Sequence, residues 1–163
     1  MPISGIVQPE LIPVDDALRL RRYDGVHAFA LPWYQDAETL WLVDGMREPY
    51  DEARLTAMYR YLDAHGELYS IEVRVDGVWR PVGDVTFWAE DMPIVVGDRS
   101  LRGQGIGLRV IRALVERGRS LGYPSLTVQE IYHYNAASRR CFEKAGFRTV
   151  EETDKGVTLR LEL

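Results

Sequence analysis

The hydrophobic pattern in the middle of the chain changes its period twice, and this change constrains the fold more than any other feature. PIVV at 93–96 is a short apolar run that predicts a buried strand. Residues 104–121 then place apolar side chains at helical spacing, namely Ile106, Val110, Ile111, Leu114, Val115 and Leu121. Gly122 and Pro124 end this helix, and SLTVQEI at 125–131 is again a strand pattern. The segment therefore predicts a strand–helix–strand unit.

The flanking segments carry their own start, stop and turn signals. Asp36 is a candidate N-cap, Asp76-Gly77 is a favoured hairpin turn, and Pro81 predicts an edge or a bulge in the second strand of that hairpin. The other predicted elements are a strand at 17–23, helices at 32–45 and 51–62, strands at 68–75 and 79–88, a helix at 136–145, and strands at 147–152 and 156–163. This order predicts an α/β (α+β) fold, in which helices flank a mixed, mostly antiparallel central sheet within a single domain, 1–163.

The composition is that of a globular chain with a substantial core, because 46% of the 163 residues are hydrophobic and 28% are charged. The first residues lack the basic and apolar segments of a secretory signal, and no apolar run is long enough to span a bilayer. The single cysteine, Cys141, excludes an internal disulfide. We therefore expect a cytoplasmic protein without a membrane partner.

The net charge of −5 hides an uneven distribution. Residues 1–98 carry 8 basic and 18 acidic side chains, a net of −10, whereas residues 99–148 carry 10 and 3, a net of +7. Residues 149–163 carry 2 basic and 4 acidic side chains, a net of −2. The cationic stretch fits a site for an anionic ligand and equally fits solvated faces. The negative total argues against a nucleic-acid partner.

A glycine-rich loop, RGQGIG at 102–107, lies between the strand at 93–96 and the long helix. Such a loop turns backbone N–H groups into one concavity at a helix N-terminus, where the helix dipole and Arg102 favour a phosphate. A simple turn is the alternative interpretation. A Walker loop would end in Gly-Lys-Ser/Thr, and a dinucleotide fingerprint would have glycine at the position of Leu108, so neither motif fits.

Two motifs at matching spacing resemble the GNAT superfamily of acyl-CoA-dependent N-acetyltransferases over residues 92–148. The loop 102–107 fits the family pattern of Gln/Arg, two residues, Gly, one residue, then Gly/Ala. Asn135 starts a helix that ends in EKAGF, similar to the family's closure of that helix. The chain is similar to the aminoglycoside 6′-N-acetyltransferase and ribosomal-protein acetyltransferase branches of this superfamily.

The resemblance implies an acetyl-CoA site without a metal. Backbone amides of 103–107 would bind the pyrophosphate, and the strand ending at Val96 would splay from the strand at 125–131 and pair with pantetheine. Asn135 would bond the pantetheine arm, while Arg139 and Lys144 are either phosphate ligands or solvated. The implied cofactor residues are Val95, Val96, Gly97, Arg102, Gly103, Gln104, Gly105, Ile106, Gly107, Asn135, Arg140 and Phe142.

Acetyl transfer to an amine needs a base, a donor to the oxyanion and a way to neutralise the thiolate. The resemblance implies the N–H of Val96 as the oxyanion donor. It also implies Glu130 as the base, because the aminoglycoside branch has an acidic residue at the matching position. An ordinary surface glutamate is the alternative. Glu72 and Asp84, on neighbouring strands, are second choices.

The general acid departs from the family pattern, because many members have a tyrosine seven residues after the asparagine and this chain has Phe142 there. Tyr134 or Tyr132 could replace it, or solvent could protonate the thiolate. A covalent mechanism through Cys141 and His133 lacks triad spacing. The three histidines are His27, His65 and His133, and they form no zinc pattern.

The acceptor side is predicted to lie on the first two helices and their loops. Aromatic and acidic side chains gather in that region of the sequence, namely Trp33, Tyr34, Asp36, Glu38, Trp41, Tyr50, Tyr59 and Tyr61. They suit a cationic amine, either a small aminoglycoside- or polyamine-like molecule or a protein N-terminus, and they equally suit an ordinary core. A monomer and a homodimer are both compatible with the sequence. An acyl-CoA-binding sensor without catalysis is the competing class of function.

Overall fold

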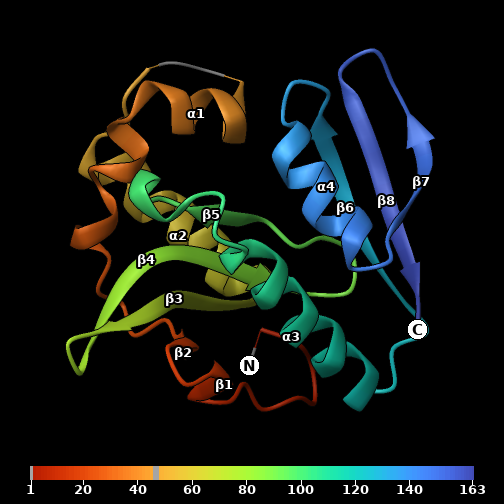
Figure 1. Ribbon diagram of the computed structural model, residues 1–163, viewed down its shortest axis with the longest axis horizontal. Coiled ribbons are helices and arrows are strands. Elements are labelled where there is room, and N and C mark those ends of the chain that lie inside the picture. Colours follow the sequence, from red (N-terminus) through yellow and green to blue (C-terminus); the bar gives the residue numbers. More distant parts are fainter. Residues whose placement is uncertain (1, 46–47) are drawn as a thin grey trace.

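The computed structural model describes residues 2–45 and 48–163 and contains two antiparallel sheets that lie side by side (Figure 1). The first sheet has the strand order β1-β2-β3-β4-β5 and the second has the order β6-β8-β7. The first sheet comprises β1 (Leu11–Asp15), β2 (Leu18–Arg22), β3 (Glu67–Val75), β4 (Val78–Phe87) and β5 (Ile94–Val96). The second comprises β6 (Ser125–Tyr132), β7 (Arg148–Glu152) and β8 (Gly156–Glu162).

Within the described residues, four α-helices connect and cover these sheets, and local capping explains where three of them begin. The Asp36 carboxylate accepts the Thr39 N–H, Asp51 accepts the Arg54 N–H, and the Asn135 amide oxygen accepts the Ser138 N–H. The helices are α1 (Ala37–Asp44), α2 (Glu52–His65), α3 (Ile106–Ser120) and α4 (Ala136–Lys144). Short 3₁₀ turns form at Ala28–Ala30, Trp33–Gln35 and Arg99–Leu101.

The predicted α/β class is confirmed, and two local predictions need correction. The sequence pattern did not indicate β1, because its side chains are exposed or half-buried and Pro13 interrupts it, which an edge strand tolerates. The helix predicted from residue 32 begins only at Ala37, after a 3₁₀ turn. Of the two alternatives predicted from Pro81, an edge or a bulge, the structure shows a bulge, because the register of β3 and β4 shifts between Ile71 and Glu72.

The central sheet is split between β5 and β6, where the sequence predicts a splayed strand pair. The two sheets are joined at one end of the split by the loop that follows β4. The Thr127 N–H donates to the Ala89 carbonyl at 2.9 Å, and the Gln129 N–H donates to the Asp91 carboxylate at 3.0 Å. Beyond this junction β5 and β6 diverge, so the backbone groups on their facing edges are available to a ligand.

Two hydrophobic cores lie on opposite faces of the first sheet. One joins both sheets to α3 and α4, and an ion pair between Arg117 and the fully buried Glu67 ties α3 to β3 at 2.6 Å. The other core packs α1, α2 and the 3₁₀ turns at Ala28–Ala30 and Trp33–Gln35 against the opposite face.

Candidate functional site

A cavity of about 360 Å³ opens along the split between the sheets. Its volume is at the small end of the range for small-molecule sites. Its walls come from α1, β5, the glycine-rich loop, α3 and α4. The lining residues are Thr39, Leu42, Val43, Ile94, Val95, Val96, Leu101, Arg102, Gly103, Gly105, Ile106, Gly107, Leu108, Ile111, Asn135, Ala137, Ser138, Arg140, Cys141 and Lys144. Three of these are cations, and none of the described lining residues carries a carboxylate.

The glycine-rich loop turns into α3 through two left-handed residues. Gly103 and Gly105 both have φ +79°, and a Cβ at either would meet no atom within 4 Å. Glycine is therefore required here by the backbone conformation and not by crowding. No side chain caps α3, so the N–H groups of its first turn have no side-chain partner and point to the cavity end of the helix. This is the geometry of an anion site.

The free edge of β5 forms a second wall. The carbonyl of Pro93 and the N–H of Gly97 both bond to β4, and backbone groups alternate along a strand. The N–H and carbonyl of Val96 therefore point away from β4, into the split. An extended amide-bearing ligand can pair with them as an added strand would.

Arg102 lies in the cavity wall, but its guanidinium faces the protein. Its Nε donates to the Val96 carbonyl at 3.1 Å, and a terminal nitrogen donates to Thr39 Oγ1 at 2.8 Å. Arg102 thus connects the glycine-rich loop with β5 and α1. Two of its N–H groups already donate to protein acceptors, so a direct phosphate contact would have to use its other donors.

Asn135 also lines the cavity, and both ends of its amide have protein partners. The oxygen accepts the Ser138 N–H at 3.2 Å, which caps α4, and the nitrogen donates to the Leu42 carbonyl at 3.4 Å. The second distance is long for a hydrogen bond, so this contact is weak. The predicted bond from Asn135 to pantetheine stays a prediction.

Three residues predicted to bind the cofactor lie outside the cavity lining. Gly97 lies under the Trp33 ring, where an added Cβ would approach the indole to 2.2 Å. Gln104 is exposed and donates to the Ser100 carbonyl. Phe142 is 1% exposed and packs edge-on against Phe147 in the first core. Gly97 and Phe142 therefore have packing roles that their sequence context did not indicate.

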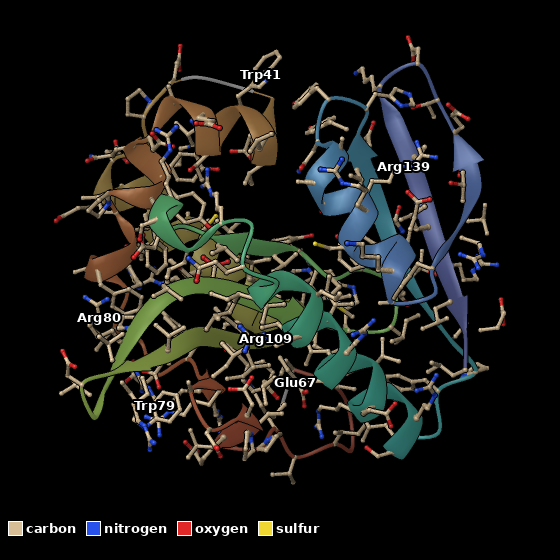
Figure 2. All side chains as sticks on the ribbon, in the orientation of Figure 1. Trp41, Glu67, Trp79, Arg80, Arg109 and Arg139 are labelled. Atoms are coloured by element: carbon tan, nitrogen blue, oxygen red, sulfur yellow. The ribbon has the colours of Figure 1, made fainter. Side chains whose placement is uncertain are left out.

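The cations of α4 divide between the two sides of the helix. Arg140 and Lys144 line the cavity, and neither has a hydrogen-bond or ion-pair partner within the described residues. Arg139, on α4 in Figure 2, instead pairs with Glu143 at 3.2 Å and does not line the cavity. Of the three candidates, the structure brings Arg140 and Lys144 to the site.

Glu130 occupies a strained position at the end of β6 where the sheets diverge. Its φ is +28°, a left-handed value that is unusual for a residue with a side chain. The pairing of β6 with β8 shifts register between Val128 and Ile131, so Glu130 sits in a β-bulge. Bulges of this kind re-aim a side chain and are frequent beside active sites. The carboxylate is exposed and does not line the cavity.

The two second-choice acids are both buried and both have partners. Glu72 accepts hydrogen bonds from Arg19 at 2.8 Å and from Arg21 at 3.0 Å. Asp84 accepts the hydroxyl hydrogen bonds of Tyr34 at 2.7 Å and Tyr59 at 2.8 Å. Burial raises the pKa of Asp84 to about 6, although the two tyrosine hydroxyls oppose the shift. Neither carboxylate lines the cavity.

The rings of Trp41, Tyr134 and Tyr132 stack in that order and form a ladder. Trp41 lies on α1, at the outside of the molecule (Figure 2). The ring centroids are 4.8 Å apart for Trp41 and Tyr134, and 5.3 Å apart for Tyr134 and Tyr132. The Tyr134 hydroxyl donates to the Trp41 carbonyl at 2.7 Å. Partial burial raises the pKa of both tyrosines, with the charges of Glu130 and Asp44 adding to the effect at Tyr132. Asp44 ends α1, three residues after Trp41, and Glu130 precedes Tyr132 by two residues on β6, so both carboxylates belong to elements that carry this ladder.

The histidines and the cysteine do not form a catalytic group. His27 bonds to Tyr23 and Thr56, and His133 bonds to the Thr153 carbonyl. Cys141 lines the cavity, and its sulfur is 3.7 Å from the position of a Cβ at Gly107. Nowhere in 2–45 and 48–163 do three His, Cys, Asp or Glu side chains gather closely enough to hold a metal ion.

The wall formed by α1 is the part of the site that sequence reasoning missed. Thr39, Leu42 and Val43 line the cavity, although the sequence placed α1 only on the acceptor side. Thr39 and its partner Arg102 are 63 residues apart in the chain. No local pattern indicates so distant a contact.

The chain belongs to the GNAT acetyltransferase family, because the family model described as Acetyltransferase (GNAT) family matches residues 30–147. No helix within the described residues is both long and apolar enough to cross a membrane. None of the curated proteins searched matches the chain.

Solved structures of low sequence identity share the fold. A domain from Methanocaldococcus jannaschii is 18% identical, covers 91% of this chain and 100% of that chain, and has a TM-score of 0.76. The acetyltransferase AAC(6′)-Ib, solved with ribostamycin and coenzyme A, is 18% identical over 90% and 94% of the two chains, with a TM-score of 0.73. RimL, a ribosomal L7/L12 alpha-N-protein acetyltransferase solved with coenzyme A, is 17% identical over 94% and 98%, with a TM-score of 0.69.

Proposed function

We propose that the protein transfers an acetyl group from acetyl-CoA to a primary amine, directly within a ternary complex. The observation that carries this proposal is that one cavity is lined by three kinds of group. They are an uncapped helix N-terminus behind two left-handed glycines, the free edge of β5, and two cations that have no partner within the described residues. Together these groups match a ligand with a diphosphate, an amide-bearing arm and an outlying phosphate. The coenzyme A complexes of AAC(6′)-Ib and RimL support the same ligand class.

Each part of the cofactor has a stated place in this proposal. The amides of 103–107 hold the diphosphate, and Arg140 and Lys144 hold the outlying phosphate. The pantetheine arm lies along Val95 and Val96, beside Asn135. The Val96 N–H, which points into the split, stabilises the oxyanion of the tetrahedral intermediate.

Glu130 is the proposed base, and its bulged, strained position is the supporting observation. Backbone strain of this kind is kept where function depends on the direction of a side chain. Glu130 accepts the ammonium proton of the acceptor, directly or through water, before the amine attacks the thioester carbonyl. Tyr134 is the proposed donor to the departing thiolate, which requires its hydroxyl to leave the Trp41 carbonyl.

The acceptor is a cationic amine, either a small aminoglycoside- or polyamine-like molecule or a protein N-terminus. The support is the ladder of Trp41, Tyr134 and Tyr132 with Asp44 and Glu130 beside it. Aromatic faces and carboxylates both attract an ammonium group. Ribostamycin, bound to AAC(6′)-Ib, and the L7/L12 substrate in the name of RimL represent the two kinds of acceptor.

A thiol-release assay with acetyl-CoA tests this function against spermidine, an aminoglycoside and a peptide with a free α-amine. We expect release with at least one amine, and Glu130→Gln is expected to lower kcat/KM by about 100-fold, the scale of a lost general base. Glu116→Gln is the matched control, because Glu116 is an exposed glutamate on α3 that pairs with Arg119. Equal losses in the two variants would remove Glu130 from the mechanism.

A sensor that binds acyl-CoA without turnover is the second candidate. Two observations favour it: Phe142 is buried in the core, and the Tyr134 hydroxyl already donates to a carbonyl. The sensor predicts that acetyl-CoA binds and that no amine releases the thiol.

A further inference from the structure

Helix α1 is attached to the cofactor side of the molecule by polar contacts at both of its ends. At the N-terminal end, Arg99 donates to Asp36 at 3.3 Å and also pairs with Glu38. At the C-terminal end, the carbonyls of residues 41 and 42 accept bonds from Tyr134 and Asn135. Figure 1 shows α1 above β5 and facing α4 across the split. The helix is therefore held against the cavity that it lines through Thr39, Leu42 and Val43.

Arg102 adds a link from the cofactor loop to the first turn of α1. Thr39 is 1% exposed, and its hydroxyl has two partners: it accepts from Arg102 at 2.8 Å and donates to the Asp36 carboxylate at 2.8 Å. Arg102 also holds the Val96 carbonyl. A continuous chain of hydrogen bonds thus runs from the edge of β5 through Arg102 and Thr39 to the N-cap of α1.

Because Arg102 belongs to the glycine-rich loop, a ligand bound to that loop acts on this chain of hydrogen bonds. Arg102 directly precedes Gly103, the first residue of the proposed phosphate cradle. A phosphate bound to that cradle restricts the backbone on which the guanidinium is mounted. A carbonyl oxygen has two lone pairs, so Val96 can accept from Arg102 and from a pantetheine N–H at the same time. Cofactor and Arg102 are therefore compatible.

We propose that Arg102 and Thr39 are positioning residues that couple occupancy of the cofactor cavity to the seating of α1. The inference rests on the proposed function, because it takes coenzyme A as the occupant. A bound cofactor fixes the loop, the loop fixes Arg102, and Arg102 holds Thr39 and α1 in place. Helix α1 carries Trp41 and Asp44 of the proposed acceptor side, so a bound cofactor strengthens acceptor binding, and the reverse holds by linkage.

Hydrogen–deuterium exchange of the α1 amides, with and without saturating coenzyme A, tests the coupling without an acceptor. In the wild-type protein we expect the cofactor to slow exchange over residues 37–44 by about fivefold, the scale of one net hydrogen bond. Thr39→Val removes the hydroxyl and keeps the backbone cap from Asp36, and we expect it to abolish this slowing. Thr39→Ser keeps the hydroxyl and should restore it.

Thr56→Val is the matched control, because Thr56 also bonds through its hydroxyl but lies on α2 and pairs with His27. In this variant, coenzyme A should slow exchange over residues 37–44 as it does in the wild type. Arg102→Met breaks the same contact from the other side and replaces Thr39→Val if that variant does not fold. Equal slowing over α1 in the wild type and in the variants that lack the contact overturns the coupling. Absence of protection in the loop 103–107 and in α4 contradicts the proposed function instead.

Discussion

The two sides of the split between the sheets are built from different kinds of groups. On the proposed cofactor side, the backbone of the loop 103–107 and the edge of β5 present N–H and carbonyl groups. On the proposed acceptor side, side chains carry the polar character, from the ladder of Trp41 and Tyr134 to the buried Asp84. A site made of backbone groups needs particular φ values and therefore glycines, which leave a local pattern in the sequence. A site made of side chains from distant segments leaves none.

The largest expected effect concerns Asp84, the buried carboxylate that accepts from Tyr34 and Tyr59 in the core packed by α1 and α2. The pKa of Asp84 is about 6 in the folded protein and 3.8 for a free carboxyl group. Between these pH values the folded state therefore binds a proton that the unfolded state does not. The contribution of Asp84 to stability is therefore largest below about pH 4 and is lost as the pH rises through 6, by roughly 3 kcal/mol. Asp84→Asn keeps an oxygen for Tyr34 and Tyr59 but cannot ionise.

Denaturant unfolding of both proteins from pH 4 to pH 8 measures this effect. We expect Asp84→Asn to gain stability relative to the wild type as the pH rises, because the variant avoids a buried charge. Titrations of other carboxylates cancel in the difference between the two proteins. A difference that is constant with pH would contradict a carboxylate that ionises inside the core packed by α1 and α2.

The next effect concerns the backbone of the cofactor side. Gly105→Ala forces a left-handed alanine, which costs about 1–2 kcal/mol, and relaxation of the loop turns the N–H groups away from the phosphates. We expect coenzyme A affinity to fall about 10- to 100-fold by calorimetry. Gly122→Ala is the control, because Gly122 has φ +78° and equally open space at the far end of α3. It should lose similar stability without losing affinity. Equal coenzyme A affinity in the two variants would contradict the assignment of the loop 103–107 to cofactor binding.

The smallest effect separates the cations of α4. Arg140→Ala is expected to weaken coenzyme A binding about fivefold at low salt and less at high salt, since its side chain is exposed. Arg139→Ala removes the same charge from the side of α4 that pairs with Glu143, and should change the affinity little. Calorimetric titrations at two salt concentrations measure both. Equal losses would indicate a diffuse charge effect and not a cavity contact.

The sequence predicted the cofactor side in more detail than the acceptor side. The strand at 93–96, the helix that follows it and most of the cavity-lining residues of the loop 102–107 could be read from spacing and glycine content. Gly97 and Phe142 were interpreted as cofactor residues, but their packing against Trp33 and Phe147 depends on tertiary contacts that no local pattern shows. The same holds for Thr39, whose partner Arg102 is 63 residues away. β1 was missed because Pro13 interrupts it and none of its alternating side chains is fully buried.

The uneven charge of the chain agrees with the proposed division of the split into a cofactor side and an acceptor side. The stretch 99–148, with a net of +7, supplies Arg102, Arg140 and Lys144 to the cavity. The stretch 1–98, with a net of −10, supplies Asp44 to the acceptor side. Anionic cofactor and cationic acceptor would thus meet opposite charges on the two sides of the split.

The most direct test of the central claim, that backbone groups of 103–107 bind coenzyme A, is an NMR titration of protein labelled with ¹⁵N-glycine. The account predicts that the amide signals of Gly103, Gly105 and Gly107 shift as coenzyme A is added, while those of Gly25 and Gly122 stay in place. Unshifted loop signals in a saturated complex, or equal shifts of loop and control glycines, would contradict it.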